Sequence, residues 1–415
     1  MRFEGAQHVV VENHGANLAE PNEVRKIGRP GPERAWFPRG RCFLASCLPM
    51  PPTAQSLAAN RYIHPLTIGG LTLENNLCLA PMAGFTNVAF RLIAKEVGGC
   101  GLVASEMVAA LALPNRGAEG RFKTLTENVP AEKPLAMQVY GRDPEMCAQT
   151  ARLLDLAGAD LIDLNCGCPV RKAKNSGCGV ALMREPEQVG RIVAAMCQAT
   201  AKPVTVKMRL GYDAENRTVM EVAAAAVENG ASALFVHART GESKHGTDVE
   251  LAPLAEVKRS VRVPVIANGS MDTAEAIRRA KDEAGVDGYQ IGRSACGDPW
   301  LFRNLIAELT GGQPYAPPLA ERRALLVRHF NLIVSLFGEA RGTRVMRKYT
   351  FFYCNGLPGV RRFRDRFMRI ASAGEFTGLV EDFFGQLERG VAEGEAEHLT
   401  LFERSTGDGA VADDE

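Results

Sequence analysis

The sequence predicts an α/β protein: a (β/α)8 TIM barrel followed by a small C-terminal domain made only of helices. Three observations predict this fold: eight short apolar runs, amphipathic helical stretches between most of them, and a wholly helical pattern after Gly311. Runs that are apolar on both faces and alternate with helices indicate a buried parallel sheet. Eight such units between Leu77 and Leu309 match the roughly 250 residues of a barrel.

The eight predicted strands are, in chain order, Leu77–Pro81, Leu102–Ser105, Leu135–Tyr140, Leu161–Asn165, Val204–Met208, Ala233–His237, Val263–Asn268 and Gly288–Ile291. Helices with Ala-rich faces and acidic first turns are predicted at Pro144–Ala157, Pro186–Ala199, Arg217–Asn229 and Thr273–Ala284. An open doubly wound sheet is the structural alternative. It would require a GxGxxG at its first turn, and Pro81-Met82-Ala83-Gly84 does not match that pattern.

The chain is expected to divide into four parts. These are a disordered N-terminal extension over 1–60, the barrel over 61–311, a basic helical domain over 312–390 and an acidic disordered tail over 391–415. A true translation start at Met50 is an alternative explanation of the first part. The helices predicted in the basic domain are Arg323–Phe337, Arg341–Cys354 and Phe363–Ala371. From Glu321 to Ile370 the chain holds 12 Lys and Arg against three acids.

The composition is 46% hydrophobic and 23% charged, which excludes collagen-like, low-complexity and small disulfide-rich classes. Forty-nine Lys and Arg against 48 Asp and Glu give a net charge of +1, so any nucleic-acid surface must be a local patch. No uninterrupted apolar window reaches the roughly 18 residues of a membrane span. Eleven irregularly spaced cysteines indicate reduced thiols, so we expect a soluble cytoplasmic protein.

Polar residues close the predicted strands, at the end of a barrel where active sites form. They are Met82 and Ala83, Glu106, Gln138, Asn165 with Cys168, Lys207 with Arg209, His237 with Arg239, Asn268-Gly269 and Gly292-Arg293. The last two pairs, each followed by Ser and a helix, are typical of a barrel phosphate site. Two tight turns that merely need Gly are the alternative.

Lys207 ends a strand where burial of its charge would be costly without an anionic partner. A reduced flavin is negative at N1 and the C2 oxygen, so it is one candidate for that partner. Schiff-base chemistry and a plain surface lysine remain as alternatives.

Asn165-Cys166-Gly167-Cys168-Pro169 is the most distinctive segment. A cysteine in such a loop can be a nucleophile, a metal ligand or a proton donor. The spacing of Cys166, Cys168 and Cys178 matches no common zinc or iron-sulfur site, so no metal is expected. An ordinary thiol is protonated near neutral pH, as a general acid must be. A buried, purely structural role suits Cys166 and Cys178.

The ordered set of motifs resembles the tRNA-dihydrouridine synthases, specifically the B-type bacterial branch, from about Ile63 to Gly390. The matching segments are Leu79-Ala80-Pro81-Met82-Ala83-Gly84, Phe90-Arg91, Ser105-Glu106-Met107, Gln138, Asn165-x-Gly167-Cys168-Pro169-x-x-Lys172 with Gly179, Lys207-x-Arg209, His237-x-Arg239-Thr240, Ala267-Asn268-Gly269 and Ile291-Gly292-Arg293. Each motif alone is weakly specific, whereas their order and spacing together are highly specific.

The resemblance implies an FMN enzyme that uses NADPH, or NADH, to reduce the C5–C6 bond of uridine in the D-loop of tRNA. The reduced flavin would deliver hydride to uracil C6, Cys168 would protonate C5, and Asn165 would orient the flavin or base. The positions that match flavin-binding residues are Pro81, Met82, Ala83, Gln138, Lys207, His237, Asn268, Gly269, Ser270, Gly292 and Arg293.

A stacked uracil cannot reach a barrel mouth, so the nucleotide must be extruded from the RNA. The expected tRNA contacts are Lys172, Arg209, Arg239, Arg344, Arg347, Lys348, Arg361 and Arg362. Most aromatic residues among the arginines, such as Tyr349, Tyr353 and Phe363, are expected to form the core of the helical domain. We expect a monomer with no protein partner.

Three departures from the family pattern stand out. Asn87 replaces an acid, Gly241–Gly246 replaces a longer basic and aromatic stretch, and Ser270 and Tyr349 replace the usual Asp and His. Two other functions remain open. One is a flavin barrel that acts on a free pyrimidine or an enone, and the other is a non-catalytic RNA-binding protein.

Overall fold

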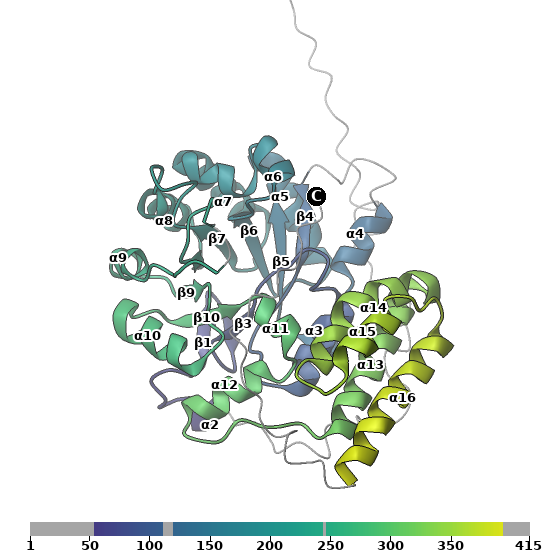
Figure 1. The fold of residues 1–415 in the computed structure, drawn as a ribbon. Coiled ribbons are helices and arrows are strands. Elements are labelled where there is room, and N and C mark those ends of the chain that lie inside the picture. Colours follow the sequence, from purple (N-terminus) through teal and green to yellow (C-terminus); the bar gives the residue numbers. More distant parts are fainter. Residues whose placement is uncertain (1–53, 111–118, 244–245, 393–415) are drawn as a thin grey trace, which may run out of the picture.

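The computed structural model describes residues 54–110, 119–243 and 246–392. Within these ranges, an eight-stranded parallel barrel is ringed by helices, and a helical bundle lies to one side of it (Figure 1). The strand order is β3-β10-β9-β8-β7-β6-β5-β4. Cys78 in β3 pairs in parallel with Leu102, the residue before β4, which closes the barrel. The predicted fold is therefore confirmed.

All eight predicted strands are present, and three of them have the predicted bounds. The strands are β3 (Leu77–Leu79), β4 (Val103–Ala109), β5 (Leu135–Tyr140), β6 (Leu161–Cys166), β7 (Val204–Arg209), β8 (Ala233–His237), β9 (Val265–Asn268) and β10 (Gly288–Ile291). The largest difference is in β4, which continues to Ala109 because its pairing with β5 resumes after a register shift beyond Ala104.

Strand residues alternate between two environments. In β6, Ile162, Leu164 and Cys166 face the surrounding helices and join the large outer core. Leu161 points the other way, into a smaller apolar cluster inside the barrel, together with Ala233 and Ile266. The period-2 geometry of a strand therefore carries Asp163 and Asn165 inward on the same face as Leu161.

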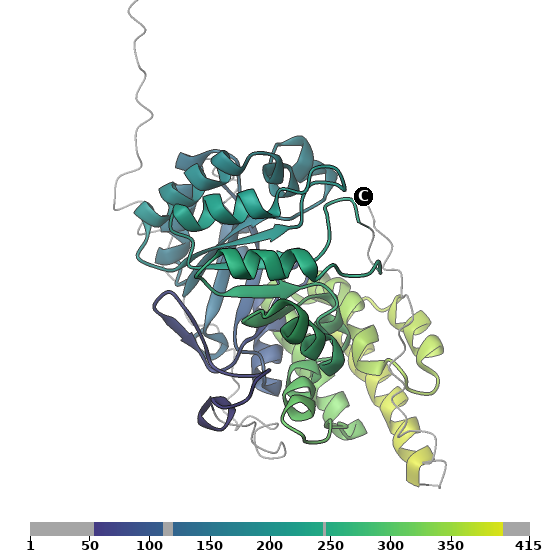
Figure 2. The ribbon, with the colours of Figure 1, turned by 90° about the vertical axis from the view of Figure 1, so that its left-hand side faces the viewer.

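A β-hairpin closes the end of the barrel at which the parallel strands begin. It is formed by β1 (Leu66–Ile68) and β2 (Leu71–Leu73), which pair antiparallel, and it lies beside the start of the barrel strands (Figure 2). Leu66, Ile68 and Leu73 pack into the inner apolar cluster. This hairpin was not predicted. The hairpin and the first residues of the strands thus form an apolar layer, the apolar floor, and the inward-facing polar residues lie on it.

The helices around the barrel follow the predicted alternation. They are α2 (Ala54–Leu57), α3 (Val88–Val97), α4 (Glu119–Thr126), α5 (Pro144–Leu156), α6 (Arg171–Asn175), α7 (Pro186–Ala199), α8 (Val219–Glu228), α9 (Ala252–Ser260), α10 (Ala274–Ala284), α11 (Arg293–Gly297) and α12 (Leu301–Leu309). Side chains of Asn87, Asp143 and Thr273 cap α3, α5 and α10 by accepting a backbone N–H. No helix in the described ranges has the length and apolarity to cross a membrane.

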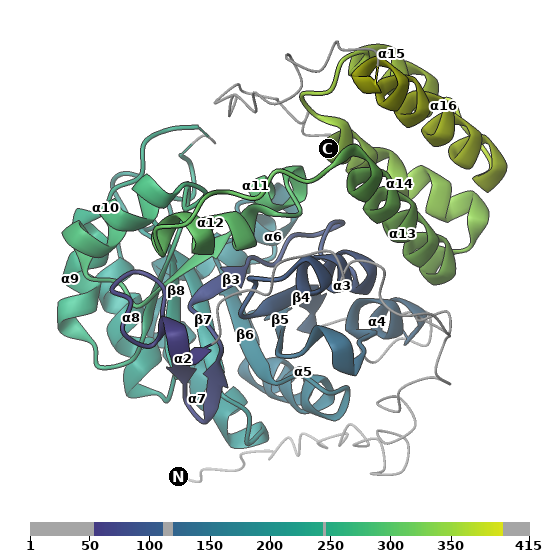
Figure 3. The same cartoon turned by 90° about the horizontal axis from the view of Figure 1, so that it is seen from below.

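The C-terminal bundle contains α13 (Leu319–Phe337), α14 (Glu339–Cys354), α15 (Val360–Phe367) and α16 (Ala373–Ala392). It packs on one flank of the barrel, next to α3 (Figure 3). Phe330 and Phe376 stack in its core at 3.7 Å between ring centroids. Three of the four helices were predicted, and α16 was not. Tyr349, Tyr353 and Phe363 are buried, as expected.

Two predicted segments lie largely outside the described residues. Of the expected N-terminal extension, only 54–60 is described, and Leu57 within α2 is buried in the core. Of the expected acidic tail, only 391 and 392 are described, at the end of α16.

Candidate active site

A layer of polar side chains lies inside the barrel, above the apolar floor. Strand pairing places its members beside one another: Gln138 is in register with Asp163, Asp163 with Thr205, and Asn165 with Lys207. On the opposite side, His237 is in register with Asn268, and Asn268 with Gln290. We call these eight residues the polar chamber: Gln138, Asp163, Asn165, Thr205, Lys207, His237, Asn268 and Gln290.

Cys168 lies in a tight turn directly after β6. The Asn165 side chain holds this turn, because its Oδ1 accepts the backbone N–H of Gly167 at 3.1 Å and that of Cys168 at 2.9 Å. Gly179 packs against the turn with a φ of +61°, and a Cβ there would lie 2.7 Å from the Cys168 carbonyl oxygen. The close approach therefore requires glycine at position 179.

Burial raises the pKa of the Cys168 thiol above its ordinary value of 9.0, although the positive charges of Arg209 and Lys207 oppose the shift. The thiol is therefore protonated at neutral pH. This state suits a proton donor and does not suit a nucleophile, which needs the thiolate. Cys166 and Cys178 are buried, which agrees with the structural role expected for them.

Lys207 crosses the chamber to Asn268. Its Nζ donates to Asn268 Oδ1 at 2.9 Å, and Asn268 Nδ2 donates to the carbonyl of Gln290 at 2.8 Å. Desolvation lowers the pKa of Lys207 to about 8, with a further lowering by Arg209, while Asp163 opposes the shift. The buried Gln290 Oε1 accepts no hydrogen bond from the described residues. The polar chamber therefore contains both the amino group of Lys207 and an acceptor with no donor in the described part of the chain, Gln290 Oε1.

A second group of residues lies beyond the end of β9. Gly269 has a φ of +103°, and a Cβ there would lie 2.8 Å from His237 Cδ2 and 3.2 Å from Arg239 Nη1. Ser270 also has a positive φ, of 52°, and its Oγ accepts from Arg239 Nη2 at 2.9 Å. Burial and the nearby charge of Arg293 lower the pKa of Arg239. Two neighbouring guanidinium groups favour an anion between or beside them.

The loop after β3, residues 80–87, completes the rim. Met82 and the turn at Gly292 are neighbours, since a Cβ at Gly292 would lie 3.7 Å from Met82 Sδ. Within the loop, Met82 N donates to Thr86 Oγ1 at 3.1 Å. Pro81 and Met82 are half-buried, and Ala83 is exposed. The structure therefore places the first predicted strand end beside the last one.

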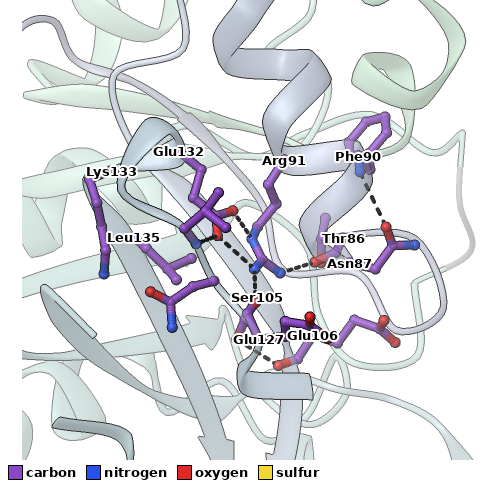
Figure 4. Close-up of polar contacts among 12 residues, drawn as sticks. Thr86, Asn87, Phe90, Arg91, Ser105, Glu106, Glu127, Glu132, Lys133 and Leu135 are labelled. Atoms are coloured by element: carbon purple, nitrogen blue, oxygen red, sulfur yellow. Dashed lines mark hydrogen bonds and ion pairs between the residues drawn. The ribbon is translucent and has the colours of Figure 1, made fainter. Parts of the chain in front are cut away.

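A buried ion pair supports this loop from behind. Arg91 Nε donates to Glu132 Oε2 at 2.6 Å, and Arg91 Nη1 donates to the Thr86 carbonyl at 2.7 Å (Figure 4). The two charged side chains are 1% and 0% exposed. Because removing one partner would leave a buried charge uncompensated, this pair fixes the loop firmly.

The sequence profile of one family, described as Dihydrouridine synthase (Dus), matches residues 78–388, which include both the chamber and the bundle. The chain belongs to the dihydrouridine synthase family. This membership confirms the expectation of an oxidoreductase of the tRNA-dihydrouridine synthase type.

Several bacterial relatives of this dihydrouridine synthase share most of its length. The chain is 37% identical over 320 residues to tRNA-dihydrouridine synthase B of Pseudomonas aeruginosa, which covers 77% of the chain and 96% of the relative. It is 35% identical over 327 residues to the protein of the same name in Xanthomonas axonopodis pv. citri, which covers 79% and 98%. The predicted B-type branch is therefore confirmed.

Solved structures with a similar fold include morphinone reductase, with a TM-score of 0.46 at 14% identity over 63% of this chain and 93% of that one. A 2-naphthoyl-CoA reductase complex gives a TM-score of 0.48 at 13% identity over 61% and 52%.

The polar-chamber residues of this dihydrouridine synthase fit a flavin, the cofactor class that the sequence resemblance implies. The orphaned acceptor of Gln290, the ammonium of Lys207 and the amide of Gln138 offer the mixture of donors and acceptors that a flavin ring edge requires. The glycine-dependent turn at Gly269 and the arginine pair suit an anionic tail.

Of the eight predicted tRNA contacts of this synthase, four are exposed and four are buried or half-buried. Lys172, Arg344, Arg361 and Arg362 are exposed. Arg209 and Arg239 are only 5% and 6% exposed, and both donate to backbone carbonyls, those of Gly167 and Thr247 respectively. Arg347 donates to the carbonyl of Ile370 at 2.8 Å. Lys348 Nζ lies over the Phe85 ring at 4.7 Å from its centroid.

Asp163, Thr205 and Gln290 were not among the site residues predicted for this synthase. A signal was available for Asp163, because a charged residue two positions before Asn165 in an apolar strand must share its inward face. The same period places Thr205 two positions before Lys207 and Gln290 two positions before Gly292, but neither residue carries a charge that would mark it as unusual in a strand. Both residues are ordinary in strands, and only the closed barrel brings them to the chamber.

Proposed function

We propose that the protein reduces specific uridines in the D-loop of tRNA to 5,6-dihydrouridine, with FMN as its cofactor and NADPH as the electron donor. The observation that carries this proposal is the position of Cys168: Asn165, which is in register with Lys207, holds its turn at the rim of the polar chamber. Membership of the dihydrouridine synthase family supports the same chemistry.

Bound FMN would supply a hydride for uracil C6. Gln138, Lys207, His237 and Asn268 would hold the ring, and Lys207 would offset the negative charge that reduction places on it. Gly269, Ser270, Gly292 and Arg293 would hold the phosphate, with Pro81, Met82 and Ala83 covering the ring from the neighbouring loop. Asn165 keeps the turn of Cys168 in place.

Cys168 would donate the proton that completes the reduction. Hydride addition at C6 would place a negative charge on C5, shared with the oxygen on C4, and the thiol would give its proton to C5 to form the saturated ring. The resulting thiolate is stabilised by the positive charges of Arg209 and Lys207, and it regains a proton from water. Each turnover thus adds one hydride and one proton to the uracil.

The RNA would be held by the basic face of the bundle. Arg344, Arg361 and Arg362 are exposed, which suits contacts to phosphates. The uridine must leave its stack to enter the barrel, at a cost of a few kcal/mol that these contacts would offset.

The test is mass spectrometry of tRNA from a strain that lacks the gene, complemented with the wild type or with Cys168→Ala. We expect dihydrouridine at one or more D-loop positions to disappear in the deletion strain and to return with the wild type only. Purified protein should be yellow and should release FMN on denaturation. Unchanged tRNA in the deletion strain, or a colourless protein that FMN does not reconstitute, would contradict the proposal.

A further inference from the structure

A continuous run of hydrogen bonds connects a buried carboxylate to the turn that carries Cys168. Thr205 Oγ1 donates to Asp163 Oδ1 at 2.7 Å, and Gln138 Nε2 donates to Asp163 Oδ2 at 2.7 Å. Asn165 Nδ2 then donates to Gln138 Oε1 at 2.8 Å. Asn165 Oδ1 finally accepts the backbone N–H groups of Gly167 and Cys168. We call this run the Asp163 relay.

The chemistry of the two ends fixes the direction of the relay. An ionised carboxylate only accepts hydrogen bonds, so Gln138 must turn its NH2 toward Asp163 and its oxygen toward Asn165. At the other end, backbone N–H groups only donate, so Asn165 must turn its oxygen toward Cys168. Both constraints require the same orientation of both amides. A flip of either amide would place two donors or two acceptors together.

Asp163 lies too deep to take part in the reaction itself. Its side chain is on the inward face of β6, one layer below Asn165, and the residue is 4% exposed. Burial raises the pKa of Asp163 to about 6, and the positive charge of Lys207 opposes this shift and favours the ionised carboxylate. The only roles that this position leaves are to orient neighbours and to balance their charge.

We propose that Asp163 is a positioning residue, which sets the orientation of Gln138 and Asn165 and through them fixes the turn of Cys168. The proposal rests on the proposed function for the role of Cys168 as acid. The relay itself is a property of the protein without flavin or RNA.

Three variants separate the relay from general loosening of the chamber. Asp163→Leu removes the acceptor of Gln138. Asp163→Asn retains it, because the new amide can keep its oxygen toward Gln138 and turn its NH2 toward the Thr205 hydroxyl, which can rotate to accept. Thr205→Val is the matched control: it also removes one hydrogen bond from Asp163, but on the side away from Cys168.

The first measurement is the rate at which Cys168 is alkylated in flavin-free protein. Mass spectrometry of the peptide that contains Cys168 monitors this rate. A loosened turn exposes the thiol and brings its pKa back toward 9, so Asp163→Leu should react about tenfold faster than the wild type. Asp163→Asn and Thr205→Val should stay within about twofold of the wild type, since the relay to Cys168 survives in both. The second measurement is FMN affinity, which should fall about tenfold in Asp163→Leu because Gln138 loses its fixed orientation.

Equal rates in the wild type and folded Asp163→Leu, or equal acceleration in all three variants, would overturn the proposal. If Asp163→Leu does not fold, Gln138→Met breaks the next link with a side chain of similar size. It should then accelerate Cys168 alkylation to the same extent, and an unchanged rate would overturn the proposal. Alkylation needs neither flavin nor tRNA, so its outcome is independent of whether the protein forms dihydrouridine.

Discussion

Asn87 of the barrel and Tyr349 of the helical bundle are hydrogen-bonded to each other, with Asn87 Nδ2 donating to the Tyr349 hydroxyl at 3.0 Å. The same hydroxyl donates to the carbonyl of Phe85, in the loop that follows β3. Both positions depart from the pattern expected of the family, and the structure brings them into contact. The bundle thus reaches the loop that forms part of the candidate flavin site.

Tyr349→Phe should therefore weaken FMN binding as well as stability. The change leaves Asn87 Nδ2 and the Phe85 carbonyl without their partner, and an unpaired buried polar group costs about 1–3 kcal/mol. Urea unfolding and FMN titration measure the two effects. Tyr353→Phe is the matched control, because its hydroxyl bonds His329 at 2.9 Å within the bundle and does not reach the loop. It should lose stability but retain FMN affinity, and equal FMN loss in both variants would argue against the coupling.

Cys168→Ala should lose RNA turnover by about 10²- to 10⁴-fold, the range typical of a missing general acid. It should still bind tRNA and accept electrons from NADPH, because the alanine leaves the chamber intact. Stopped-flow flavin reduction and dihydrouridine analysis separate the two half-reactions. Cys166→Ala provides the control, since Cys166 faces the outer core. Normal dihydrouridine formation by Cys168→Ala would eliminate the proposed acid.

The depressed pKa of Lys207 predicts how stability depends on pH. Between about 8 and its ordinary value of 10.5, Lys207 is neutral in the folded protein and still charged in the unfolded chain. The unfolded state then binds more protons, so the free energy of unfolding should rise with pH across this window. Below pH 8 the lysine is charged in both states and contributes no slope. Urea unfolding of flavin-free protein should show this rise in the wild type relative to Lys207→Met, and parallel curves for the two proteins would refute it.

Gly269→Ala should abolish FMN binding at micromolar concentrations. The new Cβ would lie 2.8 Å from His237 Cδ2, and the φ of +103° is one that alanine rarely adopts. Gly70→Ala is the control, because no heavy atom lies within 4 Å of a Cβ at that position. Fluorescence titration with FMN measures both variants. Wild-type affinity in folded Gly269→Ala would exclude this turn from the cofactor site.

Reversal of charge at Arg361 and Arg362 should weaken tRNA binding. Log affinity falls as log salt rises, and each lost phosphate contact makes this fall less steep by about 1. The double Glu variant should therefore bind more weakly and respond less to salt. Arg259→Glu, an exposed position in α9 away from the bundle, should change neither quantity. Filter binding measures the tRNA affinity between about 50 and 200 mM salt, a range over which counterion release changes affinity strongly. An unchanged slope in the double variant would remove α15 from the interface.

The strands could be predicted because each is a short apolar run between turns and helices, a local property of the sequence. Burial of polar residues depends on contacts far along the chain and was harder to predict. Arg209 and Arg239 read as free cations at strand ends, whereas the structure directs their guanidinium groups to carbonyls of neighbouring loops. The hairpin of β1 and β2 was missed because each strand has only three residues.

The hairpin beneath the barrel also constrains the order of events. Because Leu66, Ile68 and Leu73 fill the end at which the strands begin, reactants would reach the chamber from the opposite rim, where Cys168 and Met82 lie. Under the proposed function, a dinucleotide donor and a flipped uridine would both enter at this rim and would compete for the same space. The donor would then leave before the RNA enters, so reduction of the cofactor and its reoxidation would occur in two separate binding events.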